Sequence, residues 1–254
     1  MKIVRMQTAE GIAYGTVEPE GIRVYQGSPL VHWEATDVFL GFDVVTLLSP
    51  VLPSKVVCVG KNYPDHAEEM ASAVPDHPIL FLKPSTSVIG PSAPVVLPTL
   101  SKEIHHEGEL AVVIGAVARN VKAEDVGQVV LGYTIANDVT ARDLQRKDGQ
   151  WTRAKGFDTF CPLGPAIETE FDPAEGMRIA TTVNGRLRQD GTTAEMVFGV
   201  AELIEYVTSV MTLLPGDVLL TGTPSGVGPI EAGDIMEVEI EGIGKLVNPV
   251  VGPK

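Results

Sequence analysis

The sequence has few cysteines, a deficit of positive charge and no long apolar run. Cys58 and Cys161 are the two cysteines among 254 residues, and they lie in unrelated contexts, so no disulfide framework is expected. Acidic residues outnumber basic ones 33 to 19, which argues against a nucleic-acid or membrane-surface partner. No apolar stretch approaches the ~18 residues of a membrane helix, and the N-terminus lacks the apolar core of a signal peptide. These absences predict a cytoplasmic protein.

Nucleotide-binding motifs are also missing. The glycines of Gly222–Gly228 do not have the G-x-G-x-x-G spacing, and Gly242–Lys245 lacks both the spacing and the Ser/Thr of a phosphate loop. Regular alternation of strands and helices is missing too, which disfavours a doubly wound parallel sheet. We therefore expect no nucleotide cofactor, and a mostly β chain with a few helices (α+β).

The composition of the first 50 residues indicates a small N-terminal β domain. Ile12–Val17 and Gly21–Gln26 are rich in strand-forming residues and are separated by turn residues. Pro50 and Pro53 mark a plausible boundary. We predict a packing domain over residues 1–50 and a catalytic domain over residues 51–254.

The stretch Ile104–Gly115 carries the most informative chemistry. From Glu109 onward it is typical of a buried strand, yet its leading end has two carboxylates, Glu107 and Glu109. Residues two apart in a strand point to the same side, so these carboxylates would lie side by side, and one of them would take up a proton unless a cation compensates. A hard divalent cation would do so, because Mg²⁺, Mn²⁺ and Ca²⁺ prefer oxygen ligands. The alternative is a fraying strand end with two hydrated glutamates.

Other polar residues follow predicted strands. The strand Lys55–Val59 precedes a helix for which Asp65 is the expected N-cap, and on which His66 and Glu69 share a face because they are three residues apart. Asp138 stands at the exit of a predicted strand that begins at Val130.

Two further segments complete the prediction of local structure. Lys147–Lys155 is expected to be a polar loop. Apolar residues at helical spacing predict that Val200–Leu214 is a helix, ended by Pro215 and Gly216.

Taken in order, several blocks resemble the fumarylacetoacetate hydrolase superfamily over about residues 51 to 252. Each block alone is weakly specific, whereas the ordered set is highly specific. The blocks are Val57–Tyr63 with His66 and Glu69, Leu80–Pro84, His106–Gly115, Gly132–Asp138 with Ala141–Asp143, Lys155–Asp158, Met211–Asp217 and Gly222–Pro224.

The resemblance implies a fold and a set of site residues. The fold would be a mixed β-sandwich roll, assembled as a homodimer, with bound Mg²⁺ or Mn²⁺ for which Ca²⁺ could substitute. The residues matching the family's metal ligands are Glu107, Glu109 and Asp138. Those matching its catalytic groups are His66, Glu69 and Lys155, and those matching its substrate-pocket positions are Lys83, Gln145 and Thr223.

Two neighbouring residues have separate interpretations. Arg142 is equally consistent with a substrate contact and with a structural ion pair, for instance with Asp143. His106 stands where many relatives carry an aromatic residue, and we expect it to be packed rather than a ligand.

The resemblance further implies metal-dependent cleavage of a C–C bond next to a ketone in a short 2-oxo or 2,4-dioxo acid. The activity would be that of an acylpyruvate hydrolase, an oxaloacetate decarboxylase or both, through a metal-stabilised enolate. One alternative is an isomerase or decarboxylase of 2-hydroxyhepta-2,4-diene-1,7-dioate-type diacids. Another is a protein that binds a metal and a dicarboxylate without turnover.

Overall fold

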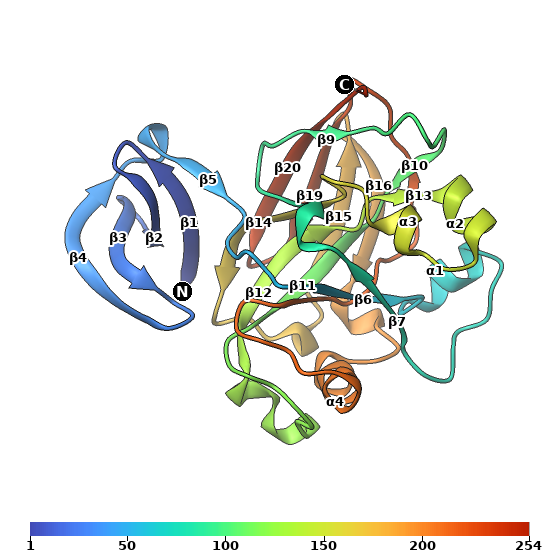
Figure 1. Ribbon diagram of the computed structural model, residues 1–254, viewed down its shortest axis with the longest axis horizontal. Helices are drawn as coiled ribbons and strands as arrows, with labels where there is room; N and C mark the ends of the chain where they lie inside the picture. Colours follow the sequence, from blue (N-terminus) through green and yellow to red (C-terminus); the bar gives the residue numbers. More distant parts are fainter. Residues whose placement is uncertain (254) are drawn as a thin grey trace.

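The computed structural model describes residues 1–253 as a small N-terminal sheet beside a large β domain (Figure 1). The N-terminal strands are antiparallel, and both strands expected there are present. Their bounds are β1 (Lys2–Thr8), β2 (Gly11–Glu18), β3 (Gly21–Ser28), β4 (His32–Leu40) and β5 (Thr46–Leu48), with a short 3₁₀ helix at Phe42–Val44. Val4, Met6 and Ile22 are buried in this part.

The large domain contains two major sheets. The first sheet continues from the N-terminal strands, because β1 pairs with β14, and its order is β4-β3-β2-β1-β14-β12-β11-β17-β6-β7. Its further strands are β6 (Val56–Gly60), β7 (Ile79–Lys83), β11 (Gly108–Ile114), β12 (Val130–Asn137), β14 (Cys161–Glu168) and β17 (Val218–Leu220), with β8 (Val88–Ile89) beside β14. Because the pairing of β1 with β14 joins the two parts, the division at residue 50 stays a prediction.

A second sheet packs against the first. Its order is β16-β15-β19-β20-β9. The strands are β9 (Val95–Val96), β15 (Arg178–Val183), β16 (Arg186–Thr192), β19 (Ile235–Ile240) and β20 (Gly244–Val251). A three-stranded sheet lies beside them, formed by β10 (Ile104–His106), β13 (Thr140–Ala141) and β18 (Gly228–Pro229).

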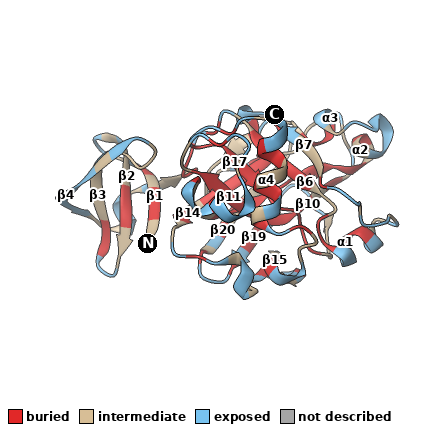
Figure 2. Ribbon diagram, turned by 90° about the horizontal axis from the view of Figure 1, so that it is seen from below, coloured by how far each residue is buried: buried red, intermediate tan, exposed pale blue. Residues whose placement is uncertain are grey.

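Helices are few and short. They are α1 (Pro64–Glu69), α2 (Arg142–Asp148), α3 (Thr152–Lys155) and α4 (Val200–Val210), with 3₁₀ turns at Ser85–Ser87, Ala123–Gln128, Pro173–Glu175 and Thr193–Glu195. The first three gather on the side of the large domain that faces away from the N-terminal strands (Figures 1 and 2). No helix within residues 1–253 is both long and apolar enough to cross a membrane.

Three local predictions need correction. α4 ends at Val210 rather than Leu214, because the chain turns extended and Leu213 forms a β-bridge with Ala118. The predicted loop Lys147–Lys155 contains α3 and the end of α2. Asp65 is not the N-cap of α1: Tyr63 holds that position and Pro64 begins the helix, where its missing N–H costs nothing.

The main core fills the space between the two sheets and under α4. Leu110, Val112 and Ile114 of β11 lie there with Ile179 of β15 and Leu203 of α4, all fully buried. Figure 2 shows the same pattern, with β11 buried along its length and one face of α4 buried. The prediction of a mostly β fold with few helices is confirmed.

Candidate metal centre and active site

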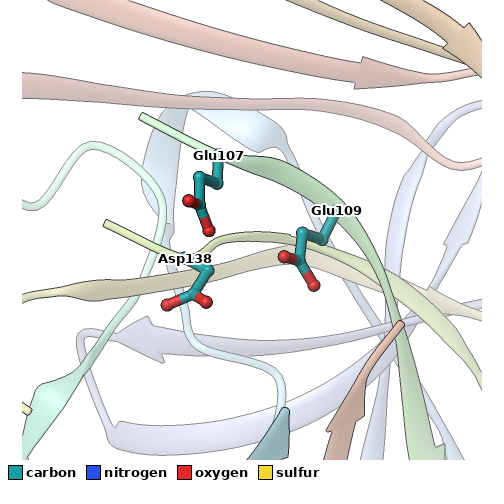
Figure 3. A group of neighbouring side chains, drawn as sticks. All are labelled: Glu107, Glu109 and Asp138. Atoms are coloured by element: carbon teal, nitrogen blue, oxygen red, sulfur yellow. The ribbon is translucent and has the colours of Figure 1, made fainter. Parts of the chain in front are cut away.

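Three carboxylates converge inside the large domain. One oxygen from each of Glu107, Glu109 and Asp138 lies within 4.8 Å of the others, and the side chains point toward one another (Figure 3). All three residues are buried, with at most 4% of their surface exposed. The register of β11 and β12 brings them together, because it sets Gly108 opposite Asn137, and so the start of one strand meets the end of the other.

Glu107 lies at a break in the predicted strand. We expected one strand to carry both glutamates, but β10 ends at His106 and β11 begins at Gly108. β10 pairs with β13 and β18, whereas β11 pairs with β12 and β17 in the large sheet. The chain thus passes from one sheet to another at Glu107, and the two carboxylates still face the same point.

Three cationic side chains balance the carboxylates. Lys155 Nζ donates to Asp138 Oδ2 at 2.6 Å and to Glu107 Oε2 at 2.7 Å. Lys83 Nζ donates to Asp138 Oδ1 at 2.6 Å, and Arg142 Nη2 pairs with Glu107 Oε1. Burial alone would raise the pKa of Glu107, but Arg142 and Lys155 hold that pKa well below its usual range.

Glu109 has no cation of its own among the described residues. Its Oε2 accepts a hydrogen bond from the Gly222 amide at 2.8 Å. Burial, followed by the charges of Asp138 and Glu107, raises its pKa well above the ordinary value. A divalent cation would relieve this conflict and keep Glu109 ionised, since a hard ion prefers carboxylate ligands. The donor set therefore fits the predicted metal, because Mg²⁺ and Mn²⁺ both prefer oxygen ligands.

The predicted histidine–glutamate pair is formed on α1. His66 Nδ1 lies 3.2 Å from Glu69 Oε2. The Glu69 carboxylate also accepts from the Gly226 amide, at 3.2 and 3.3 Å to its two oxygens. His66 is 6% exposed. The pair is thereby anchored through Glu69, and the other ring nitrogen of His66 has no protein partner among residues 1–253.

A cavity of about 200 Å³ joins these groups. Clefts for drug-sized ligands enclose about 300–1,000 Å³, so this one suits a smaller molecule. Of the predicted residues, those that line it are His66, Glu107, Glu109, Asp138, Arg142, Gln145, Lys155 and Thr223. Glu69 and Lys83 do not line the cavity: Glu69 lies behind His66, and Lys83 is fully buried against Asp138.

The predicted substrate contacts have partners within the protein. Arg142 pairs with Glu107 and donates to Gln145 Oε1 at 2.8 Å, whereas Asp143, the partner suggested by sequence, accepts from Ser101 instead. The Thr223 hydroxyl donates to the Gly108 carbonyl at 2.8 Å. Its single hydroxyl hydrogen is committed there, so Thr223 could reach a substrate through an oxygen lone pair or its backbone, but not by donating from the hydroxyl.

Several cavity residues were missed from the sequence. Lys61 and Arg146 add positive charge to its wall, and Phe81 and Trp151 add an aromatic surface, with ring centroids 5.1 Å apart. Arg146 could have been found, because it lies one helical turn after Arg142 on α2. Lys61 gave only the weaker signal of standing between a predicted strand and a helix.

His106 behaves as expected for a packed residue. It is fully buried, and its Nδ1 lies 3.2 Å from Gln189 Oε1, outside the carboxylate triad. Burial lowers its pKa to about 4. A neutral imidazole can bind a metal, but His106 lies outside the carboxylate triad and does not line the cavity, so it is not a candidate ligand.

The chain is similar to known proteins along its whole length. The family model described as fumarylacetoacetate (FAA) hydrolase C-terminal matches residues 55–251, and a model described as Rv2993c-like, N-terminal matches residues 1–50. Protein Rv2993c of Mycobacterium tuberculosis is 48% identical over 266 residues, covering 99% of this chain and 98% of the relative. A human mitochondrial oxaloacetate tautomerase is 48% identical over 219 residues, covering 82% of this chain and 70% of the relative.

A solved structure shows the same fold over nearly the whole length. It is that of 2-hydroxyhepta-2,4-diene-1,7-dioate isomerase from Mycobacterium marinum, with 46% identity and a TM-score of 0.92, covering 99% of this chain and 98% of the other. The resemblance inferred from the ordered blocks is therefore confirmed, and the chain belongs to the fumarylacetoacetate hydrolase superfamily of enzymes.

Proposed function

We propose that the protein acts on short 2-oxo dicarboxylic acids at a site for Mg²⁺ or Mn²⁺, with Ca²⁺ as a possible substitute, and that it transfers a proton at the carbon next to the keto group. The observation that carries this proposal is one small cavity lined by a buried carboxylate triad, a lysine and His66. Tautomerisation of an oxaloacetate-like acid is the reaction favoured, because a human relative is named for it.

The metal would be held by Glu107, Glu109 and Asp138. A divalent ion bound there would supply a Lewis acid that polarises the substrate's keto oxygen and makes the neighbouring C–H more acidic. Lys155 is poorly placed to be the base that removes this proton, because its ammonium group donates to Asp138 Oδ2 and Glu107 Oε2. Burial lowers its pKa, and these two carboxylates raise it. Its role is to offset negative charge in the cavity.

His66 is the group best placed to carry the proton. The Glu69 carboxylate only accepts hydrogen bonds, so it holds the hydrogen of the neutral ring on Nδ1. That leaves Nε2 as a base. Proton removal from the substrate carbon and its return to the enol oxygen would interconvert the keto and enol forms without any other reagent.

Charge favours a dicarboxylate over a monocarboxylate. The three carboxylates and the three cations that contact them balance one another. A divalent ion would leave the centre with two positive charges, which a dianion would neutralise. At the wall, Lys61 has no ion-pair partner within residues 1–253, and Arg146 has only the part-exposed Glu103. Such surface pairs contribute about 0–1 kcal/mol, so Arg146 can turn to a substrate carboxylate at little cost.

Cleavage of a C–C bond is the second candidate, favoured by the same His66–Glu69 pair. The free Nε2 could deprotonate a water instead of the substrate, as hydrolysis of a 2,4-dioxo acid requires, while decarboxylation needs no base at all. Isomerisation of a longer diacid is supported by the name of the Mycobacterium marinum relative. Binding without turnover is disfavoured, because it would give His66 no role in the cavity. A homodimer remains a prediction.

Proton exchange at the substrate carbon tests the proposal. We expect Mg²⁺- or Mn²⁺-loaded protein to speed deuterium exchange at C3 of oxaloacetate, measured by NMR, together with the loss of enol absorbance, and a chelator to stop both. His66→Ala should remove the exchange. The control is His32→Ala, because His32 makes a similar pair with Glu34 on the exposed surface of the N-terminal sheet.

The outcomes separate the candidates. Exchange without pyruvate formation indicates a tautomerase, and pyruvate formation from oxaloacetate or acetylpyruvate indicates cleavage. If His66→Ala exchanges C3 as fast as the wild type, His66 is not the base. Metal-independent exchange would contradict the whole proposal.

A further inference from the structure

The break in the chain at Glu107 leaves backbone groups that need partners outside the usual strand pairing. The Glu107 amide donates to Asn137 Oδ1 at 2.9 Å, and the Gly108 amide donates to Gln189 Oε1 at 2.9 Å. Both acceptors are side-chain amides, although most buried backbone groups pair with other backbone groups. The two amides at this break are therefore held by side chains, whereas the Glu107 carbonyl accepts from the Asp138 backbone amide at 2.8 Å.

Gln189 uses its whole hydrogen-bonding capacity here. It lies on β16 and is fully buried. Its Oε1 accepts from the Gly108 amide and from His106 Nδ1, and its Nε2 donates to Thr223 Oγ1 at 2.7 Å and to the Pro224 carbonyl at 2.8 Å. The opposite amide orientation would face one donor with another at Gly108 and one acceptor with another at Pro224, so only this orientation is satisfied.

These contacts close a ring around Gly108. The Gly108 amide donates to Gln189, Gln189 donates to the Thr223 hydroxyl, and that hydroxyl donates to the Gly108 carbonyl at 2.8 Å. Gly108 stands between Glu107 and Glu109, so the ring fixes the peptide planes on both sides of it. Because the two peptide planes are fixed, the directions in which both glutamate side chains leave the backbone are fixed as well.

Gln189 also positions Glu109 indirectly, through the segment that contains the Gly222 amide. Gln189 anchors Thr223 and Pro224, and the residue before them, Gly222, donates its amide to Glu109 Oε2 at 2.8 Å. Gln189 thereby holds in place the one hydrogen-bond donor of Glu109 among the described residues. Residues outside the ligand set commonly orient metal ligands in this way.

We propose that Gln189 is a positioning residue for the metal centre: it sets the directions of Glu107 and Glu109 and holds the Gly222 amide against Glu109. The inference rests on the proposed metal-binding role of the triad. Mutation of a residue that supports metal ligands typically lowers metal affinity by about 10- to 100-fold. We expect mutation of Gln189 to lower Mn²⁺ affinity by a factor in that range.

The variants separate positioning from general stability. Gln189→Leu removes every bond of the amide, whereas Gln189→Glu keeps an acceptor for Gly108 but places a carboxylate oxygen against the Pro224 carbonyl and draws the Thr223 hydroxyl away from Gly108. Asn248→Leu is the matched control. Asn248 is also a buried amide on a strand, donating to the Gly90 and Ala93 carbonyls at 2.9 and 2.8 Å, and it does not line the cavity.

The experiment is Mn²⁺ titration of the full-length proteins by calorimetry, with thermal unfolding in parallel. We expect wild type to bind Mn²⁺, both Gln189 variants to bind it about 10- to 100-fold more weakly, and Asn248→Leu to bind it as wild type despite a lower Tm. Excess Mn²⁺ should restore kcat in Gln189→Glu, because the ligands themselves are intact.

Each other result counts against the inference. If Gln189→Glu lowers Tm but binds Mn²⁺ as tightly as wild type, Gln189 serves stability alone. Should the Gln189 variants not fold, the same result for Thr223→Val leads to the same conclusion. If Asn248→Leu loses Mn²⁺ affinity equally, the effect is not specific to Gln189. If wild type itself binds no Mn²⁺, the proposed function fails and this inference fails with it.

Discussion

Substitution of Gly108 tests whether the positions of Glu107 and Glu109 depend on the packing around the start of β11. A β-carbon added at this position would lie 2.3 Å from Thr181 Oγ1 and 2.9 Å from Val238 Cγ1, closer than real contacts allow. If residue 108 carries a side chain, either β11 has to move away from β15 and β19 or the packed side chains of Thr181 and Val238 have to rotate. Inserting atoms into a packed core typically costs about 1–3 kcal/mol, and we expect Gly108→Ala to lose that much stability.

We expect the Gly108→Ala substitution to impair the metal centre as well as the stability of the fold. Any shift of residue 108 moves both neighbouring glutamates and breaks the ring with Gln189 and Thr223. A misplacement of about 1 Å can cost about 100-fold in rate. We expect Gly108→Ala to lose Mn²⁺ affinity and about 100-fold in kcat/KM, measured by calorimetry and by the C3 exchange assay.

A second substitution makes this reasoning refutable. The Thr181 hydroxyl is buried and has no hydrogen-bond partner among residues 1–253, so removing it alone should cost little. Thr181→Ala removes the nearest clashing atom, and in the Gly108→Ala background it should restore part of the stability and of the Mn²⁺ affinity. A double variant no better than Gly108→Ala alone, or a single Gly108→Ala that binds Mn²⁺ as wild type, would refute the reasoning.

Three further predictions concern the charge of Lys155, the loss of stability at acid pH and stabilisation by Mn²⁺. Lys155→Met should lower kcat by about 100-fold or more, as loss of one stabilising donor does in other enzymes, measured with saturating metal. Burial alone would raise the Asp217 pKa, but bonds from Lys55 and Ser54 hold it below its ordinary 3.8. The resulting stability is present at neutral pH and is lost as pH falls below about 4, so urea unfolding of Asp217→Asn should show a smaller loss over that range than wild type. Mn²⁺ at 100 times its Kd should stabilise wild type by about 2.7 kcal/mol, raising Tm by roughly 5–10 °C, and Asp138→Asn should abolish the shift.

Local sequence was sufficient to nominate the residues that bear the chemistry. Glu107, Glu109 and Asp138 stand at strand ends where a hydrated or metal-bound carboxylate is expected, and the ordered blocks separated these alternatives. Their convergence depends on the antiparallel register of β11 and β12, which sequence alone did not provide. The His66–Glu69 pair was predictable because helical spacing is a local property.

The supporting residues could not be predicted, because their partners are distant in sequence. Gln189 contacts Gly108 across 81 positions and Thr223 across 34, and nothing in its own surroundings distinguishes it from an exposed strand residue. Strand bounds failed for a similar reason. The break at Glu107 arises from pairing with two different sheets, which is a tertiary property that overrides local strand propensity.

The most direct test of the central claim is a crystal grown or soaked with Mn²⁺ and measured for anomalous scattering. The account predicts a single strong peak in each chain, within coordination distance of oxygens from Glu107, Glu109 and Asp138. A peak elsewhere, or no peak while the three carboxylates keep the positions of Figure 3, would contradict it.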